Sequence, residues 1–164
     1  IALEATCVLI GPKGRRTIPV EKFCTAPGKN ALGIGELLVA LQFPPRKPNM
    51  GAHYLRFIPR NEMDIAVVGV GASVVLNDSK SLIRSARVAL AAVAPTPILA
   101  KEASDFLAGR EPTESAIEEA AEIAKRAAKP ISDMRGTARQ RVHLVGVMTK
   151  RALHTAIDRA REAP

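Results

Sequence analysis

The chain has 164 residues, of which 47% are hydrophobic and only 3% aromatic, and its formal net charge is +8. This length favours one domain or two small ones, with a core built mainly from Ala, Val and Leu. The scarcity of aromatic side chains, with no Trp, argues against a nucleic-acid partner, because single-stranded nucleic acids are bound largely by stacking on aromatic rings.

The charged and metal-binding residue types show no clustering. The 24 Lys and Arg residues are scattered, and we interpret most of them, Arg139 and Arg141 included, as solvated surface. The two cysteines, Cys7 and Cys24, and the three histidines match no metal-ligand spacing, so no metal site is expected, and Cys7 is interpreted as a core residue. The chain has no apolar run of transmembrane length and no signal peptide, which predicts a soluble, cytoplasmic protein without a transmembrane segment.

The first 45 residues have the period-two pattern of strands. A phosphate-binding loop at Gly11 and Gly14 is rejected, because no Gly-Lys-Ser/Thr follows and no helix begins there. The expected elements are strands at Ala2–Ile10, Arg16–Val20 and Glu36–Phe43, a hairpin turn at Gly11–Gly14 and a loop at Phe23–Leu32. The proline-rich stretch Pro44–Asn49 cannot form a helix or a strand ladder and is the predicted boundary between residues 1–45 and 50–164.

After this boundary the pattern changes from strands to helices. The expected strands are His53–Ile58, Ala66–Leu76 and Leu82–Val93, with Asn77–Ser81 as the turn between the last two. The expected helices are Pro97–Ala108, Glu114–Ala128 and Thr137–Arg161. Strands followed by helices, with antiparallel connections, predict the α+β class.

The most specific stretch is the charged loop Arg60–Ala66, which precedes a strand of small and β-branched residues. Gly69 and Gly71 lie within that strand, where glycine allows another backbone or a flat ligand to approach closely. They lack the third glycine of a dinucleotide fingerprint. Asp64 has two interpretations, a general base or, more commonly for a loop carboxylate, an ion pair with Arg60. No convincing catalytic constellation is present.

This loop resembles the flavin-facing loop of the FAD-binding medium subunits of molybdenum hydroxylases, the carbon monoxide dehydrogenase and xanthine dehydrogenase family. Three further stretches are similar in the same order, so that the resemblance covers nearly the whole chain. They are Gly35–Leu38 leading to Pro44, Ala86–Leu90 leading to Pro97, and Ser132–Thr137 leading to His143–Gly146.

The resemblance implies a set of FAD-binding residues. Asp64 and Ile65 would lie beside the isoalloxazine ring, the carboxylate bonding its polar edge and the aliphatic side chain shielding one face. Arg56 and Arg60 would balance the charge of a reduced, anionic flavin. Leu38 would approach the FAD from the adjoining domain, with core packing as its alternative role. Some relatives have Tyr where this chain has Ile65, so the contact here would be aliphatic packing rather than aromatic stacking.

The resemblance also implies partners. Residues 1–45 would close the FAD-binding domain and residues 50–164 would form the C-terminal domain. FAD would pass electrons from iron–sulfur clusters on a small subunit to an external acceptor, and a large subunit would carry the molybdopterin. The glycine-rich loops that hold the FAD pyrophosphate in this family do not occur in these 164 residues. The alternative is therefore a non-catalytic subunit-docking fragment that has lost FAD binding.

Overall fold

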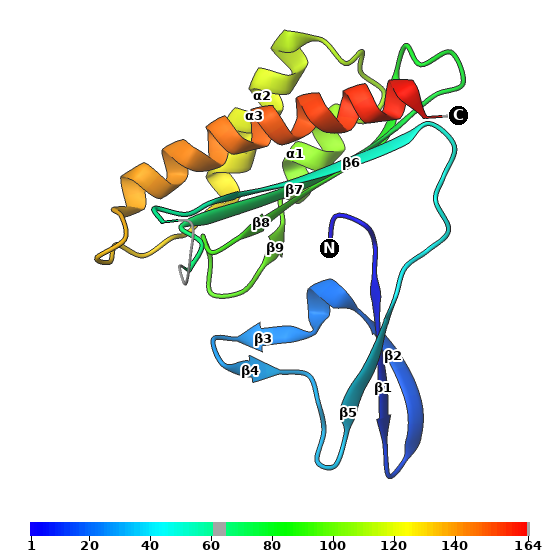
Figure 1. The fold of residues 1–164 in the computed structure, drawn as a ribbon, viewed down its shortest axis with the longest axis vertical. Coiled ribbons are helices and arrows are strands. Elements are labelled where there is room, and N and C mark those ends of the chain that lie inside the picture. Colours follow the sequence, from blue (N-terminus) through cyan, green and yellow to red (C-terminus); the bar gives the residue numbers. More distant parts are fainter. Residues whose placement is uncertain (61–64, 164) are drawn as a thin grey trace.

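The chain folds into a four-stranded sheet covered by three helices and, beyond a linker, a smaller three-stranded sheet (Figure 1). The computed structural model describes residues 1–60 and 65–163. All the strand pairings are antiparallel. The predicted α+β class is confirmed.

The three-stranded sheet has the order β2-β1-β5, with β1 at Thr6–Gly11, β2 at Gly14–Pro19 and β5 at Leu37–Gln42. The hairpin between β1 and β2 closes where Gly11 pairs with Gly14. Cys7 is fully buried there, as predicted. Expectation and structure differ at two places. The first strand begins at Thr6 rather than Ala2, because Glu4 has a positive φ of 57° that breaks the extended backbone.

The second difference concerns the predicted loop at Phe23–Leu32, which contains a short ladder. Its strands are β3 at Cys24–Ala26 and β4 at Lys29–Asn30, after a one-turn 3-10 helix, η1, at Val20–Lys22. Strands of two or three residues have too few positions for a period-two pattern to appear in the sequence.

The four-stranded sheet is a meander of order β6-β7-β8-β9. Its strands are β6 at Met50–Phe57, β7 at Val68–Leu76, β8 at Ile83–Ala91 and β9 at Ile98–Leu99. In β7 the alternate residues Val68, Val70 and Val74 belong to the hydrophobic core with the helices. Between them, small residues face the other side, where the Oγ of Ser73 donates to the carbonyl of Ala2 at 2.7 Å. The strand is therefore buried on both faces, which explains why its sequence is one continuous apolar run.

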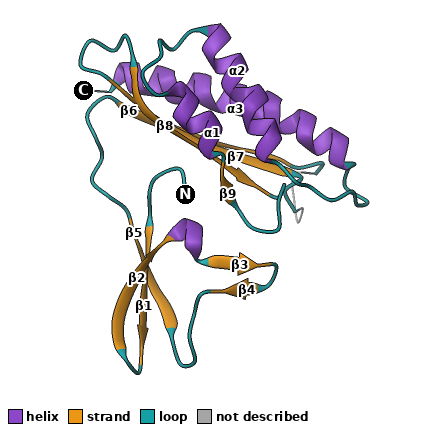
Figure 2. Cartoon of the chain, turned by 180° about the vertical axis from the view of Figure 1, so that it is seen from behind, coloured by secondary structure: helices purple, strands orange, loops and turns teal. Residues whose placement is uncertain are grey.

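Helices cover one face of this sheet, whereas the chain's first residue lies beside the other face (Figures 1 and 2). The helices are α1 at Lys101–Leu107, α2 at Glu114–Ala127 and α3 at Ala138–Glu162. α3 packs on β6 and β7, α1 packs on β8, and α2 packs on both of the other helices. The predicted start of α1 at Pro97 is wrong, because Ile98 and Leu99 pair with β8 as strand β9.

The other two helices begin within one residue of the prediction, each directly after a threonine. Thr113 and Thr137 accept hydrogen bonds from the backbone N–H three residues later, which satisfies one of the free donors of a helix N-terminus. The long helix α3 lies close to β6 at Gly51. A Cβ built there would come within 3.0 Å of the carbonyl oxygen of Ala156 and the amide nitrogen of Ala160. The two backbones are thus in direct contact.

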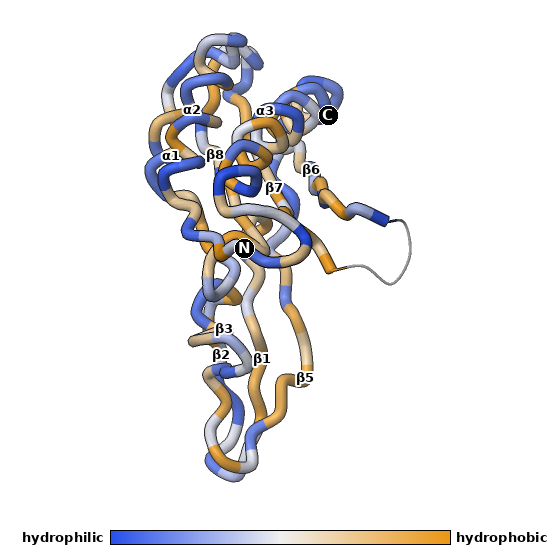
Figure 3. Tube along the Cα trace, turned by 90° about the vertical axis from the view of Figure 1, so that its left-hand side faces the viewer, coloured by the Kyte–Doolittle hydropathy of each residue, from blue (hydrophilic) through white to orange (hydrophobic). Residues whose placement is uncertain are grey.

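Strand β5 is an exposed apolar strand, visible as an orange segment in Figure 3. All six of its residues are exposed, and they include Leu37, Leu38, Val39 and Leu41. Because successive side chains point to opposite faces, both faces of β5 are bare. None of the helices in the described residues combines the length and apolar character needed to cross a membrane.

Candidate functional site

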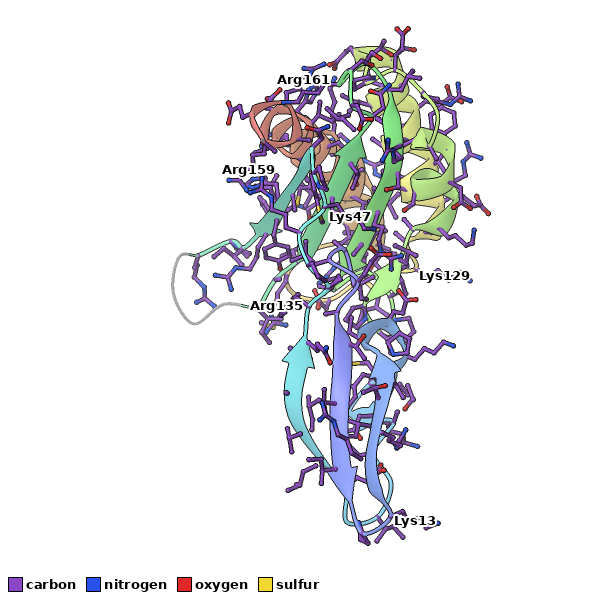
Figure 4. All side chains as sticks on the ribbon, turned by 90° about the vertical axis from the view of Figure 1, so that its right-hand side faces the viewer. Lys13, Lys47, Lys129, Arg135, Arg159 and Arg161 are labelled. Atoms are coloured by element: carbon purple, nitrogen blue, oxygen red, sulfur yellow. The ribbon has the colours of Figure 1, made fainter. Side chains whose placement is uncertain are left out.

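A pocket of about 360 Å³ lies where the four-stranded sheet approaches the N-terminal part of the chain. We call it the Ile65 pocket, after the predicted site residue in its wall. Its lining combines apolar side chains with basic ones and comes from five segments: Pro27 between β3 and β4, Ile65 and Ala66 before β7, Ala92, Ala94 and Pro95 after β8, Lys129, Pro130, Ile131, Asp133 and Arg135 between α2 and α3, and Arg141 of α3. Figure 4 shows Lys129 and Arg135 at this end of the sheet.

The buried guanidinium of Arg141 organises the inner wall of the pocket. Only 4% of the residue is exposed, which corrects the interpretation of Arg141 as solvated surface. Its Nη1 donates to the carbonyls of Val67 at 2.9 Å and Ala92 at 3.2 Å, and its Nη2 donates to Asp133 Oδ1 at 2.7 Å. The backbone N–H of Arg135 and the Arg141 guanidinium lower the pKa of Asp133, so this carboxylate stays ionised beside the cation.

The structure places the predicted site residues in three locations. Ile65 is 63% exposed and lines the pocket, where it shares the wall with Pro27 from the N-terminal part. Arg56 pairs with Gly69 in the β6–β7 ladder and is exposed on the face opposite the helices, and Arg60 is exposed just beyond β6. Asp64, with its proposed ion pair to Arg60, lies outside the described residues.

Leu38 lies apart from these residues, on β5 of the three-stranded sheet, and is not among the residues that line the Ile65 pocket. It is 40% exposed, so it is not part of the core of this sheet. The start of its strand is held by a bidentate pair in which Arg16 donates to both oxygens of Glu36, at 2.7 and 2.6 Å. Glu36 also accepts from the backbone N–H of Gly33 at 2.6 Å.

This carboxylate gives a prediction for acid stability. Hydrogen bonds from Arg16 and then from Gly33 lower the pKa of Glu36 from 4.5 to about 2. A lowered folded-state pKa stabilises the fold above the unfolded value of 4.5, and this contribution is lost as the pH falls through about 2. Glu36→Gln is therefore expected to reduce the loss of folding free energy as the pH falls from 4.5 to about 2. Urea unfolding at a series of pH values measures this loss.

The control is Glu119→Gln, at an exposed position of α2. It should leave the acid dependence as it is in the parent chain. An unchanged acid dependence in Glu36→Gln would contradict the role assigned to the Arg16–Glu36 pair.

The two glycines of β7, Gly69 and Gly71, have structural roles away from this pocket. Gly69 and Gly71 leave room for neighbouring side chains: a Cβ at Gly69 would lie 2.9 Å from the hydroxyl of Tyr54, and one at Gly71 would lie 3.4 Å from the Cβ of Ala2. A larger cavity of about 660 Å³ lies between the linker and the end of α3, and none of the predicted site residues that the structure describes lines it. Within the described residues, no group of three or more His, Cys, Asp and Glu is placed to hold a metal ion.

Sequence reasoning missed Arg141, Asp133 and Pro27 as pocket residues. Arg141 had a detectable signal, because it precedes Val145 by four residues on the buried face of α3. A cation in register with a helix's apolar face is a candidate for burial with a partner. Pro27 had no such signal, since its contact with the pocket depends on how two distant segments pack.

Comparison with known families agrees with this fold. The family model described as the CO dehydrogenase flavoprotein C-terminal domain matches residues 53–156, and the chain belongs to this family. The match contains the strands and helices that hold most of the Ile65 pocket. The expected membership in the family of FAD-binding medium subunits of molybdenum hydroxylases is thereby confirmed.

Individual relatives cover almost the whole chain. It is 34% identical to the carbon monoxide dehydrogenase medium chain of Hydrogenophaga pseudoflava over 95% of its length, and 30% identical to the xanthine dehydrogenase FAD-binding subunit of Escherichia coli O157:H7 over 96%. In both cases the match covers 53% of the relative, so the chain spans about half the length of these curated proteins.

Solved structures give the same result. Carbon monoxide dehydrogenase from H. pseudoflava, in a form that lacks the Mo-pyranopterin moiety of its molybdenum cofactor, matches with a TM-score of 0.91 at 33% identity, over 97% of this chain and 54% of that one. Quinoline 2-oxidoreductase from Pseudomonas putida 86 matches with a TM-score of 0.85 at 29% identity, over 97% and 54% of the two chains.

Proposed function

We propose that this chain is the C-terminal part of an FAD-binding electron-transfer subunit of a molybdenum hydroxylase. Within the complex, this subunit relays electrons from the iron–sulfur clusters of a small subunit, through FAD, to an external acceptor, and a large subunit holds the molybdopterin. The observation that carries the proposal is the match to a carbon monoxide dehydrogenase chain over 97% of this chain with a TM-score of 0.91.

In this proposal the two sheets have different roles. Residues 1–45 complete the FAD-binding domain, and residues 50–164 form the C-terminal domain. The separate sheets β2-β1-β5 and β6-β7-β8-β9 support this division, as does the linker of prolines between them. The family match from residue 53 onward begins close to the proposed boundary.

The residues of the Ile65 pocket fit the ring system of a flavin. Prolines, alanines and Ile131 give apolar walls that suit a flat aromatic face. Lys129 and Arg135 supply positive charge around it, whereas the charge of Arg141 is balanced by Asp133. Bound FAD would supply the redox chemistry, since a flavin exchanges electrons in steps of one or two. The buried Nε of Arg141 has no hydrogen-bond partner among the described residues, so the pocket lining includes an unsatisfied polar atom as well as apolar side chains.

Each site residue then has a physical task. Ile65 covers one face of the ring and excludes water. Leu38, which does not line the Ile65 pocket, approaches the FAD from the FAD-binding domain and adds an apolar contact to it. Arg56 and Arg60 lower the energy of the anionic reduced state by their positive charge. Asp64 accepts a hydrogen bond at the polar edge of the ring.

A first experiment measures the visible absorption spectrum and intact mass of the complete polypeptide that contains this chain, and of the 164-residue chain alone. Flavin bands are expected in the complete polypeptide but not in the 164-residue chain alone, because the glycine-rich pyrophosphate loops of the family do not occur in residues 1–164. Flavin-free protein after reconstitution with FAD would overturn the proposal. If such protein still captured the two partner subunits, the chain would instead be a docking module.

The second experiment changes Ile65 to alanine in the complete polypeptide. Loss of the partly buried aliphatic contact is expected to raise the FAD dissociation constant about tenfold, which corresponds to roughly 1.4 kcal/mol. Titration followed by flavin fluorescence measures it. The matched control is Ile34→Ala, at a fully exposed position outside the pocket, which should not change the dissociation constant.

A further inference from the structure

Arg141 connects three segments that are far apart in the sequence. It lies in the first turn of α3. Its guanidinium reaches Val67 just before β7, Ala92 just after β8, and Asp133 in the α2–α3 loop. All four residues lie in or beside the Ile65 pocket, and Val67 follows the pocket residue Ile65 by two positions.

A buried guanidinium contributes little net stability to a fold. Removing a guanidinium from water carries a large desolvation penalty, and an apolar side chain of similar volume often stabilises a core as well or better. Here one carboxylate and two carbonyls offset the penalty, while the buried Nε has no hydrogen-bond partner within residues 1–60 and 65–163. What an apolar side chain cannot do is hold two backbone carbonyls in place with a rigid planar donor.

The backbone at the contacted positions needs such support. Ala92 has a φ of 64°, in the left-handed region that alanine rarely adopts, and its carbonyl is one of the two acceptors. Val67 is completely buried, whereas Ile65 is 63% exposed. The chain therefore leaves the core within two residues of the contact with Arg141. A fixed Val67 carbonyl limits where the Ile65 side chain can lie.

We propose that Arg141 is a positioning residue for flavin binding: by holding the carbonyls of Val67 and Ala92, it fixes the backbone that presents Ile65 to the ring. Asp133 orients the guanidinium for this task. The inference rests on the proposed function. It adds to that function a residue that acts on the cofactor-contacting loop from outside it.

The test uses the complete polypeptide with FAD and four variants. Arg141→Met keeps the length of the side chain without its donors, Arg141→Lys keeps the charge without the planar fork, and Asp133→Asn removes the orienting charge. Arg139→Met, at an exposed position two residues earlier on α3, is the control. The readouts are the FAD dissociation constant, the visible circular dichroism of the bound flavin, and amide exchange in residues 65–68 without FAD.

Arg141→Met and Arg141→Lys are both expected to weaken FAD binding about tenfold, to change the flavin dichroism, and to speed amide exchange at residues 65–68. Asp133→Asn should do the same to a smaller extent, about threefold, because an amide oxygen still accepts a hydrogen bond. The control should resemble the parent protein in all three readouts.

A double-mutant cycle separates positioning from general destabilisation. If Arg141 acts through Ile65, then Ile65→Ala and Arg141→Met together should weaken binding little more than either change alone. Fully additive losses would overturn the role, as would parent-like binding in a folded Arg141→Met. Should Arg141→Met fail to fold, the same cycle is run with Asp133→Asn. A parent protein without flavin would overturn the proposed function as well, whereas flavin binding that is insensitive to Arg141 would overturn this inference alone.

Discussion

Replacing Gly51 with alanine is expected to lower the free energy of unfolding by about 3 kcal/mol or more, at the upper end for overpacked sites. The added Cβ would lie within 3.0 Å of backbone atoms of Ala156 and Ala160 and 2.9 Å from the carbonyl carbon of Arg159. These are atoms of a helix backbone, which cannot rotate away as a flexible side chain can. The helix would have to move off β6 along much of their shared contact.

The matched control for this substitution is Gly71→Ala, on the neighbouring strand β7. There a Cβ would meet only ordinary contacts, 3.4 Å from Ala2 Cβ and 3.8 Å from Tyr54. Its expected effect is below about 1 kcal/mol. Urea unfolding followed by circular dichroism compares the two variants, and equal losses of stability would show that β6 and α3 are not held in backbone contact.

Leu153→Ala is expected to have the second large effect, a loss of about 2–5 kcal/mol in the free energy of unfolding. Leu153 is completely buried on α3 and belongs to the hydrophobic core shared by the four-stranded sheet and the three helices. The truncation removes transfer free energy and leaves a cavity in this core. The measurement is again urea unfolding at neutral pH.

Leu153→Met is the conservative partner for this experiment, because it keeps nearly the same volume. Its expected loss is less than about 1.5 kcal/mol. If the alanine and methionine variants lost the same stability, the assignment of Leu153 to a tightly packed core would be wrong.

Most of the framework could be predicted from the sequence because it depends on local patterns. The apolar run of β7 and the 3.6-residue periodicity of α2 and α3 act within single elements. Thr113 and the loop prolines mark where elements begin and end. The errors at Ala2 and Pro97 concern strand and helix ends, where a single backbone angle or a two-residue pairing decides the outcome.

The site was less accessible to sequence reasoning, because its parts meet only after folding. Ile65 was found through a resemblance, since nothing in the pattern of an exposed aliphatic residue predicts a pocket. The sequence predicts a surface position for Arg141, because charged residues are rarely buried. Its burial depends on Asp133 and on two backbone carbonyls, and no one-dimensional pattern displays that combination.

The bare strand β5 has a consequence for the life of the chain after synthesis. It stands at the edge of its sheet, with Leu37, Val39 and Leu41 exposed. The unpaired backbone groups of an apolar edge strand can form hydrogen bonds with a strand of another chain. The protein is therefore prone to aggregation while this edge is uncovered. Yield and solubility during expression should therefore depend on how soon this edge is covered, and chaperone demand should fall when a covering segment is produced in the same cell.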